Sequence, residues 1–318
     1  MKVAIATRFG GDPEDFIRRF PDVEFVVVPE QAPVPPLPDV EVCIGGPNPD
    51  RFRAILAAAP GLRWFHTVSA GVERMVIPEL LAKEDLVLTN STGPYDVPIA
   101  EFVLGMMFAV AKRVPAHLRD QREHRWPRGA EVGTHAELRD AVLVVLGLGS
   151  IGTELAGLAR GVGMRVIGVR RSGRPDANAE RVVAPDRLAA VVRGADYLAI
   201  TAALTPDTRG LVSRDVIAAL KPTAWLVNVA RGPIVDEAAL LEALRARRIG
   251  GAVIDAWWEE PLRPDSPWWD LDNVIVTPHL SNSSPRLRER SVELFAENLG
   301  RFQRGEQLAN VVDKRLGY

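Results

Sequence analysis

Cysteine and histidine are scarce in this sequence, whose 318 residues include one cysteine and five histidines. A single cysteine excludes a disulfide within the chain. Cys43 stands between Val42 and Ile44 in a strand-like stretch, so we expect a buried and inert thiol. The histidines have neither the paired helical spacing nor the cysteine neighbours that are typical of metal sites, and no metal is predicted.

Long apolar runs and an excess of one charge are missing as well. No apolar run approaches membrane-spanning length, and the first six residues turn polar at Thr7 and Arg8 without the apolar core of a signal peptide. A net charge of -2, with 25% charged residues, gives no general attraction to nucleic acid or anionic lipid. We therefore expect a cytoplasmic protein that binds neither membranes nor nucleic acids.

The sequence does contain a regular alternation of short apolar runs and helical segments. Runs that are apolar at every position are typical of strands buried on both faces of a doubly wound parallel sheet. The predicted strands cover residues 3–7, 24–28, 40–44, 62–68, 86–89, 141–146, 166–169, 195–200, 225–229, 252–255 and 274–277. Because the chain is longer than one core usually supports, we predict an α/β protein with two Rossmann-like or flavodoxin-like domains and a cleft between them.

The segments between these strands predict loops, caps and a crossover. Residues 33–38 contain four prolines, which exclude a helix or an inner strand. Residues 99–114 predict one long apolar helix, followed by the charged, tryptophan-containing segment 119–128, and we interpret the two as the crossover into the second domain. Asp236 is a predicted N-cap of a later helix, and residues 285–302 predict the last helix.

A glycine-rich motif directly follows the strand predicted at 141–146. It reads Gly147-Leu148-Gly149-Ser150-Ile151-Gly152 and opens a predicted helix over 153–160, which is the strand, turn and helix context of a dinucleotide site. The first glycine allows the turn, the second lets the backbone approach a pyrophosphate, and the third lets the helix pack on the strand. The free amides and dipole of the helix N-terminus favour phosphate binding.

The residues after the next strand predict which dinucleotide is preferred. NAD-specific sites place a carboxylate there to bind the ribose hydroxyls, whereas this sequence has Arg170, Arg171 and Ser172. Because arginine binds phosphate through a planar fork of donors, we predict that these residues bind the 2'-phosphate of NADP, with NAD as the other possible cofactor. The alternative interpretation is a loop with two solvent-exposed arginines.

Three polar residues that follow later strands suit hydride transfer to a small 2-oxo acid. Arg231, Glu260 and His279 each follow a predicted strand, and ligands of open α/β sheets bind beyond the carboxyl ends of the strands. A guanidinium can bind the substrate carboxylate and polarise its carbonyl, and a histidine can exchange the proton. Glu260 would orient the histidine and favour its protonated form, so the mechanism needs no metal.

In this order, the motifs resemble those of the D-isomer-specific 2-hydroxyacid dehydrogenases over nearly all of the chain. The matching segments are 69–73, 90, 100–101, 147–152, 204–210, 228–232, 255–261 and 277–279. The resemblance implies catalytic roles for Arg231, Glu260 and His279, and a substrate carboxylate held by backbone amides near Ala70 and Gly71. It further implies cofactor contacts at Ala230 and Asp255, with the nicotinamide carboxamide at Asp255.

The resemblance also implies a domain arrangement and an assembly. Residues 1–98 and 283–318 are expected to form the substrate domain, and residues 99–282 the inserted dinucleotide-binding domain. A homodimer formed through the helix after the crossover is expected. Glyoxylate or hydroxypyruvate is the preferred prediction for the 2-oxo acid.

Two features leave alternatives open. Asp255-Ala256-Trp257-Trp258 replaces the usual Asp-Val-Phe, and a second pair, Trp268-Trp269, follows; we interpret all four indoles as packing residues rather than as walls of a pocket. Glu260 argues against a formate dehydrogenase, which carries glutamine there. A nucleotide-sensing corepressor of the same fold, a phosphite dehydrogenase and a phosphoglycerate dehydrogenase remain as alternatives.

Overall fold

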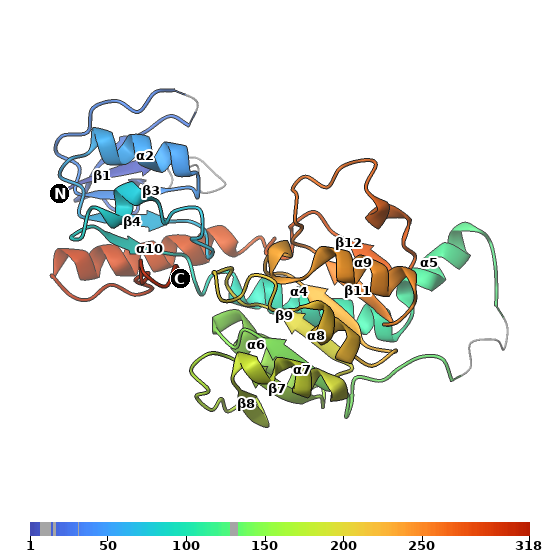
Figure 1. Ribbon diagram of the computed structural model, residues 1–318. Helices are drawn as coiled ribbons and strands as arrows, with labels where there is room; N and C mark the ends of the chain where they lie inside the picture. Colours follow the sequence, from blue (N-terminus) through green and yellow to red (C-terminus); the bar gives the residue numbers. More distant parts are fainter. Residues whose placement is uncertain (7–13, 15–16, 31, 128–132) are drawn as a thin grey trace. The chain divides into compact units, whose positions relative to one another are not determined.

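The computed structural model describes residues 1–6, 14, 17–30, 32–127 and 133–318, and it divides into two compact units (Figure 1). Unit 1 comprises Met1–Tyr95 and Ser284–Tyr318, and unit 2 comprises Asp96–Ser283. The second unit thus begins at Asp96 instead of residue 99, because helix α4 (Asp96–Ala111) begins there. It ends at Ser283 instead of residue 282.

Unit 1 is built on a five-stranded parallel sheet with the strand order β2-β1-β3-β4-β5. Its strands are β1 (Lys2–Ala6), β2 (Glu24–Val27), β3 (Val42–Gly45), β4 (Trp64–Thr67) and β5 (Val87–Thr89). All five lie where strands were predicted, although Thr7, the predicted end of the first, falls outside the described residues. This order is that of flavodoxin-like folds, as predicted.

Helices cover both faces of this sheet. The helices of unit 1 whose bounds lie within the described residues are α2 (Pro49–Ala58), α3 (Pro78–Leu81) and α10 (Leu287–Gln303). One apolar cluster joins Phe52 and Ile55 of α2 to Phe65, and a second joins Phe295 of α10 to Trp64 on the opposite face. Cys43 is fully buried, and burial raises the pKa of its thiol, as expected for an inert side chain.

Unit 2 is built on a seven-stranded parallel sheet with the order β12-β11-β10-β9-β6-β7-β8. Its strands are β6 (Val142–Leu146), β7 (Arg165–Val169), β8 (Arg181–Val183), β9 (Tyr197–Ile200), β10 (Trp225–Asn228), β11 (Gly251–Ile254) and β12 (Val274–Val276). Six of these strands were predicted, and the edge strand β8 was not. The chain reverses its direction across the sheet between β6 and β9, which is the point where doubly wound sheets bind ligands.

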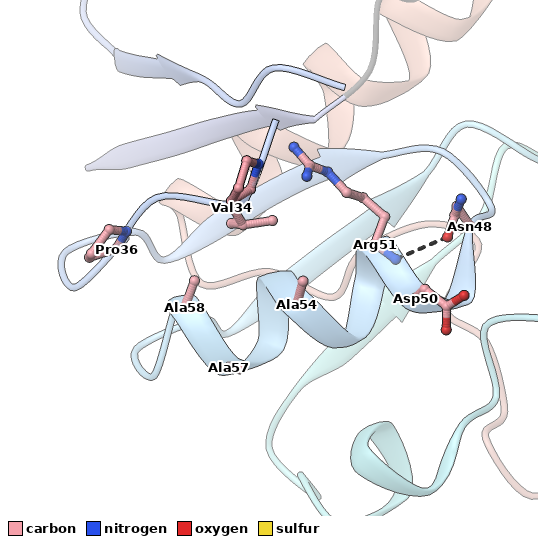
Figure 2. Close-up of a pocket in the computed structure, with 9 residues that line it drawn as sticks. Val34, Pro36, Asn48, Asp50, Arg51, Ala54, Ala57 and Ala58 are labelled. Atoms are coloured by element: carbon pink, nitrogen blue, oxygen red, sulfur yellow. Dashed lines mark hydrogen bonds between the residues drawn. The ribbon is translucent and has the colours of Figure 1, made fainter. Parts of the chain in front are cut away.

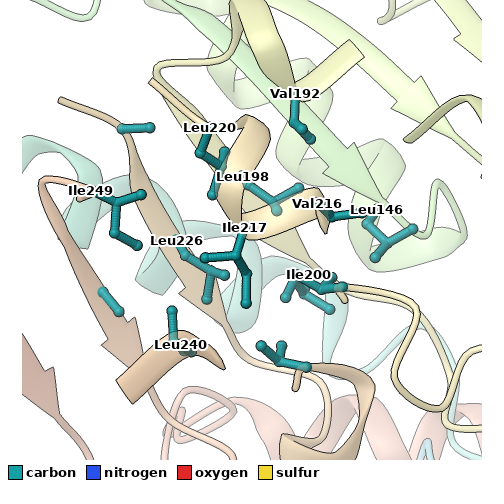
Figure 3. Packing of buried hydrophobic residues seen from close by; sticks show 14 of the residues in the cluster. Leu146, Val192, Leu198, Ile200, Val216, Ile217, Leu220, Leu226, Leu240 and Ile249 are labelled. Carbon is teal, nitrogen blue, oxygen red and sulfur yellow. The ribbon is translucent and has the colours of Figure 1, made fainter. Parts of the chain in front are cut away.

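Helices α6 (Ser150–Gly161), α7 (Leu188–Val191), α8 (Arg214–Ala219) and α9 (Glu237–Arg245) connect these strands. Figure 3 shows Leu198, Ile200 and Leu226 of the central strands packed together with Ile217 of α8 and Leu240 of α9. The Asp236 side chain accepts from Ala239 N at 3.0 Å, so the predicted N-cap of α9 is confirmed. Apolar packing against the helices thus stabilises the sheet, and the polar residues of unit 2 discussed below follow the carboxyl ends of its strands.

The crossover differs from the prediction of one helix over 99–114. Helix α4 ends at Ala111, and a second helix, α5 (Val114–Arg122), follows it. Arg113 between them has φ +54°, a left-handed conformation that interrupts a right-handed helix. Pro115 has no N–H with which to continue α4, but it is tolerated in the first turn of α5. The predicted charged segment 119–128 begins inside α5, and its last residue, Arg128, lies outside the described residues.

No helix within the described ranges combines the length and the apolar character needed to cross a membrane.

A buried polar network joins β4 to β5 and fixes the proton of His66. Trp64 Nε1 donates to Thr89 Oγ1 at 2.8 Å, and Thr89 Oγ1 lies 2.8 Å from His66 Nδ1. His66 Nε2 lies 3.1 Å from Ser91 Oγ, whose one proton goes to the Thr67 carbonyl at 3.0 Å. Ser91 must therefore accept from Nε2–H, which leaves Nδ1 as an acceptor for the Thr89 hydroxyl. His66 is a neutral structural residue.

The titration of His66 predicts how stability depends on pH. Burial lowers its pKa to about 3, whereas in the unfolded chain the pKa is about 6.5. Between these values only the unfolded chain is protonated, so this contribution to stability is complete above pH 6.5 and is lost as the pH falls towards 3. We expect His66→Gln, which cannot titrate, to have a pH dependence shallower by roughly 1 kcal/mol per pH unit between pH 6 and 5.

Urea unfolding of both proteins at pH 8, 7, 6 and 5 measures this difference. The variant should be the less stable protein at pH 8, because a buried network is disturbed, and the gap should narrow as the pH falls. Unfolding free energies that decline in parallel would show that His66 is protonated in the folded state.

Candidate active site

The glycine loop after β6 has the geometry that a dinucleotide requires. Gly147 has φ +98°, and a Cβ there would lie 2.4 Å from the backbone of Ala202. A Cβ on Gly152 would lie 2.2 Å from the Gly147 carbonyl oxygen, so only glycine lets α6 pack this closely on the strand. A Cβ on Gly149 would have no neighbour within 4 Å, which leaves open space at the position that approaches a pyrophosphate.

The N-terminus of α6 lies at this loop. Gly149 is its N-cap and supplies no side-chain cap, so the first amides, at Ser150, Ile151 and Gly152, suit the oxygens of a phosphate. No acidic residue stands in the first turn of α6. The Ser150 hydroxyl lies 3.0 Å from Asp96 Oδ1 on α4, which holds the two helices together here. The residues present therefore fit a dinucleotide phosphate.

Arg170, the first residue after β7, donates hydrogen bonds to backbone carbonyls of the chain. Its Nε donates to the Arg174 carbonyl at 2.8 Å, its Nη2 to the Pro175 carbonyl at 2.8 Å, and its Nη1 to the Leu148 carbonyl at 3.2 Å. The side chain is 15% exposed and lies 4.0 Å from Asp176. Because these donors bond to backbone carbonyls, Arg170 holds the loop, and its predicted contact with a 2'-phosphate stays a prediction.

The exposed polar side chains of residues 171–175 are those of Arg171, Ser172 and Arg174. The first two were predicted from the sequence, and Arg174 was not. Ser172 Oγ accepts from Arg174 N at 3.4 Å, so these residues share one turn. The signal for Arg174 was present in the sequence as a third arginine in the run 170–174, but nothing local distinguished the arginine that points into the loop.

The three predicted catalytic residues lie at the carboxyl ends of adjacent parallel strands. Arg231 follows β10, Glu260 follows β11 and His279 follows β12. The last residues of these strands are cross-strand partners: Asn228 of β10 pairs with Ile254 of β11, and Ile254 pairs with Val276 of β12. The same edge of the sheet carries the glycine loop after β6. Strand order therefore gathers residues that are far apart in the sequence.

Glu260 and His279 form a direct pair. His279 Nδ1 lies 2.8 Å from Glu260 Oε1 and 3.0 Å from Oε2. Their side chains are 33% and 35% exposed, so both reach solvent. Because Nδ1 faces the carboxylate, Nε2 is the ring nitrogen that can exchange a proton with a ligand.

Asp255 holds the turn that presents His279. Its carboxylate is fully buried and accepts from Thr277 Oγ1 at 2.7 Å, from Leu280 N at 3.0 Å and from Ser281 N at 2.9 Å. Its carbonyl accepts from His279 N at 2.9 Å. His279 has φ +54°, an uncommon conformation for a residue with a side chain, and these four bonds stabilise it. The predicted contact between Asp255 and the nicotinamide carboxamide stays a prediction.

The turn that carries Arg231 is held from its own strand. Asn228 is buried, its Nδ2 donates to the Arg231 carbonyl at 3.1 Å, and its Oδ1 accepts from Ala230 N at 3.1 Å. Arg231 Nη1 donates to the Ala230 carbonyl at 2.7 Å. A Cβ on Gly232 would lie 2.4 Å from the backbone at Trp257 and Trp258, so the turn after β10 lies directly against the loop after β11.

In unit 1, the predicted substrate loop follows β4. Ser91 N donates to the Ser69 carbonyl at 3.0 Å, and Asn90 Nδ2 donates to the Ala70 carbonyl at 2.9 Å. Ala70 and Gly71 are both partly exposed. Asn90, one of the motif positions found in the sequence, therefore fixes the backbone of this loop.

Of the four tryptophans in the segment 257–269, three pack together and the fourth does not. Trp257 and Trp268 are buried, and Trp258 stacks on Trp268 with ring centroids 5.4 Å apart and planes at 12°. The packing interpretation is confirmed for these three, although Trp257 and Trp258 also line a hollow of about 170 Å³. Trp269 is 50% exposed, so packing within the chain does not account for it.

A larger hollow, of about 810 Å³, lies in unit 1 between α2 and the proline-rich segment (Figure 2). None of the predicted site residues lines it. Figure 2 shows Arg51 at the start of α2, where its backbone N donates to Asn48 Oδ1 at 2.9 Å and its Nη1 reaches the Ala32 carbonyl. Arg51 therefore anchors the proline-rich loop.

Within the described part of the chain, no three histidine, cysteine, aspartate or glutamate side chains are grouped to hold a metal ion.

Comparison with known proteins supports this geometry. Residues 104–281 match the family model of the D-isomer specific 2-hydroxyacid dehydrogenase, NAD binding domain. The chain is 32% identical over 268 residues to a glyoxylate reductase of Korarchaeum cryptofilum, covering 82% of this chain and 79% of that protein. It is 31% identical to a D-3-phosphoglycerate dehydrogenase of Methanocaldococcus jannaschii over 86% of this chain, but spans only 52% of that relative.

A solved structure resembles the whole chain. It is the NADPH-dependent glyoxylate/hydroxypyruvate reductase of Sinorhizobium meliloti in complex with NADP and sulfate, which has a TM-score of 0.85, 27% identity and coverage of 100% of this chain and 99% of that one. The family model covers more than half of the chain, in the unit that carries the glycine loop, Arg231, Glu260 and His279. The chain is therefore an NAD(P)-dependent oxidoreductase that belongs to the D-isomer specific 2-hydroxyacid dehydrogenases.

Proposed function

We propose that this enzyme reduces a small, unphosphorylated 2-oxo acid, glyoxylate or hydroxypyruvate, with NADPH as the preferred reductant. The observation that carries the proposal is the His279–Glu260 pair at the sheet edge that also carries the glycine loop. The similarity to a glyoxylate reductase and to an NADPH-dependent glyoxylate/hydroxypyruvate reductase supports the choice of substrate and cofactor.

The roles of the catalytic residues follow from their positions. Arg231 binds the substrate carboxylate and polarises the C2 carbonyl through its planar fork of donors. His279 holds a proton on Nε2 and delivers it to the carbonyl oxygen as C2 gains a hydride and the C–O double bond becomes single. Glu260, at Nδ1, keeps the ring oriented. In oxidation the proton moves back to Nε2.

The cofactor would be held by the glycine loop and the loop after β7. Gly147, Gly149, Ser150, Ile151 and Gly152 would receive its pyrophosphate at the N-terminus of α6. The bound nicotinamide supplies the hydride in reduction and accepts it in oxidation. Ala230, buried at the end of β10, would stand beside it.

At the 2'-phosphate we propose Arg171, Ser172 and Arg174 in place of the predicted set that included Arg170. The exposure of these residues in one turn supports this assignment. In unit 1, the backbone amides near Ala70 and Gly71 would contact the substrate carboxylate. Asp255 would act as a positioning residue for the His279 turn.

We further propose that the enzyme is a cytoplasmic homodimer. Apolar side chains exposed on α4 and α5, namely Phe108, Val114 and Leu118, support an interface there. The similarity to a D-3-phosphoglycerate dehydrogenase supports a second candidate, the oxidation of phosphoglycerate. The substrate panel below distinguishes this activity from the proposed one.

A substrate panel tests the proposed function. The purified chain is assayed with glyoxylate, hydroxypyruvate and 3-phosphohydroxypyruvate, each with NADPH and NADH. We expect the highest kcat/KM with glyoxylate or hydroxypyruvate, and a KM for NADPH about tenfold to a hundredfold below that for NADH, because one charge-assisted phosphate contact is worth about 1.5 to 3 kcal/mol. Preference for the phosphorylated acid would replace the proposed substrate, and equal use of NADH would refute the cofactor assignment.

Matched arginine variants locate the cofactor preference. Arg171→Ala combined with Arg174→Ala should remove most of the preference for NADPH, and raised salt should weaken it in the wild type. Arg193→Ala is the control, because Arg193 is also exposed but precedes β9 at the other edge of the sheet.

A further inference from the structure

The loop after β11 contains a residue, Trp257, that contacts Glu260 and the turn that carries His279. Trp257 lies between Asp255 and Glu260 and is buried. Its backbone N donates to Glu260 Oε1 at 2.9 Å, and its indole Nε1 donates to the Thr277 carbonyl at 3.0 Å. Thr277 stands two residues before His279, so one residue is bonded to the Glu260 carboxylate and to the turn that presents the imidazole.

The geometry of the His279–Glu260 pair needs support from other contacts, because the attraction between the two side chains is too weak to fix it. The two side chains are about one-third exposed, and an ion pair in contact with water contributes little to fixing its own geometry. Proton delivery requires the imidazole to be placed within about 0.5 Å of its productive position. The loops that carry Glu260 and His279 must therefore be fixed relative to each other by other contacts.

The indole is itself rigidly held. The Trp257 ring packs edge-on against Trp258, with centroids 6.4 Å apart, and against Trp268, with centroids 5.7 Å apart. Trp258 Nε1 donates to the Val235 carbonyl at 2.9 Å, and Trp268 Nε1 to Glu237 Oε1 at 3.3 Å. These two bonds tie the cluster to the start of α9, so the Trp257 N–H meets the Thr277 carbonyl from a fixed support.

Phenylalanine, the usual residue of the family pattern at this position, cannot make this bond. It fills similar space, but its ring has no donor. Asp255 already binds the far side of the same turn, through Leu280 and Ser281. The indole adds a contact on the near side, before His279.

We propose that Trp257 is a positioning residue for the His279–Glu260 pair, acting through its indole N–H to the Thr277 carbonyl and its backbone N–H to the Glu260 carboxylate. This inference rests on the proposed acid–base role of the pair. Trp257 touches neither substrate nor cofactor in this scheme and acts only through His279 and Glu260.

The test is Trp257→Phe in the full chain, which removes the indole donor and keeps an aromatic ring. We expect kcat/KM for glyoxylate with NADPH to fall about threefold to tenfold, the effect of losing one hydrogen bond, while the dissociation constant for NADPH is unchanged. Trp269→Phe is the matched control, since it removes an indole donor that bonds to the Arg263 carbonyl and neither supports Trp257 nor reaches the His279 turn. Its kcat/KM should stay within about twofold of wild type.

A double variant separates positioning from general stability. If Trp257 acts through His279, Trp257→Phe should cause no further loss in the His279→Ala background, because the proton donor is already absent. An equal loss in both backgrounds, or equal losses in the Trp257 and Trp269 variants, would overturn the proposal. Unchanged kcat/KM in Trp257→Phe would overturn it as well.

Two further measurements cover a variant that does not fold and separate the role of Trp257 from the proposed function. If Trp257→Phe does not fold, benzothienylalanine at position 257 replaces the N–H with sulfur in a ring of the same size, and the same comparisons apply. Wild-type glyoxylate reduction and its loss in His279→Ala test the proposed function separately. If wild type is active and His279→Ala keeps full activity, the acid–base role fails and the inference on Trp257 fails with it.

Discussion

Turnover should fall about a hundredfold to ten-thousandfold when His279 is replaced with alanine, the usual range for losing a positioned general acid. The variant still offers Arg231 to the substrate and the glycine loop to the cofactor, so it should bind NADPH normally. Water can reach the site, because the His279 side chain is one-third exposed, and it can supply the proton slowly. The loss should therefore appear in kcat for 2-oxo acid reduction.

Steady-state kinetics and NADPH fluorescence titration measure the two parts of this prediction. His124→Ala is a suitable control, because His124 is exposed beyond α5 and has no part in the proposed mechanism. Turnover near the wild-type value in His279→Ala would remove His279 from the mechanism. Loss of cofactor binding would instead point to a disturbed turn at 277–281.

Arg231→Lys should lower kcat/KM for the 2-oxo acid on the order of a hundredfold, with effects on both kcat and KM. Lysine keeps the charge but is a single-point donor, and it cannot contact the carboxylate and the C2 carbonyl together through a planar fork. Each charge-assisted bond that is lost costs about 1.5 to 3 kcal/mol. Because the carbonyl contact strengthens as charge develops on oxygen, kcat should fall as well as affinity.

The matched control for this variant is Arg248→Lys. Arg248 is an exposed arginine paired with Glu242 at the end of α9, on the edge of the sheet away from the strand ends that carry the site. Its substitution should leave kcat/KM unchanged. If Arg231→Lys has wild-type kinetics, Arg231 only supports the turn after β10.

The structure differs from the sequence-based predictions at one loop, one edge strand and one helix boundary. Arg170 and Arg171 are neighbours of the same type, yet the first bonds to carbonyls of its own loop and of Leu148, while the second is exposed. The edge strand β8 was missed because its three residues, partly exposed, carry no long apolar run. The predicted helix over 99–114 was wrong at Arg113, where the apolar pattern continues but the backbone turns left-handed.

The sequence by itself determined the features that depend on short-range patterns. Apolar runs predicted eleven of the twelve described strands, since burial on both faces demands apolar side chains at every position. The glycines at 147 and 152 were assigned correctly as the tight turn and the close helix contact, because each role depends on a missing Cβ that only glycine provides. The approach of a pyrophosphate to Gly149 stays a prediction.

Only the tertiary structure decided the hydrogen-bond partners of the site. Asp255 bonds to donors at 277–281, and Trp257 reaches Thr277, twenty residues along the chain. Nothing in the local sequence identifies these partners, because β11 and β12 must first pair before their two loops can meet. The sequence therefore determines which type of side chain follows each strand. The placement of His279 against Glu260 arises from packing between segments that are distant in the chain.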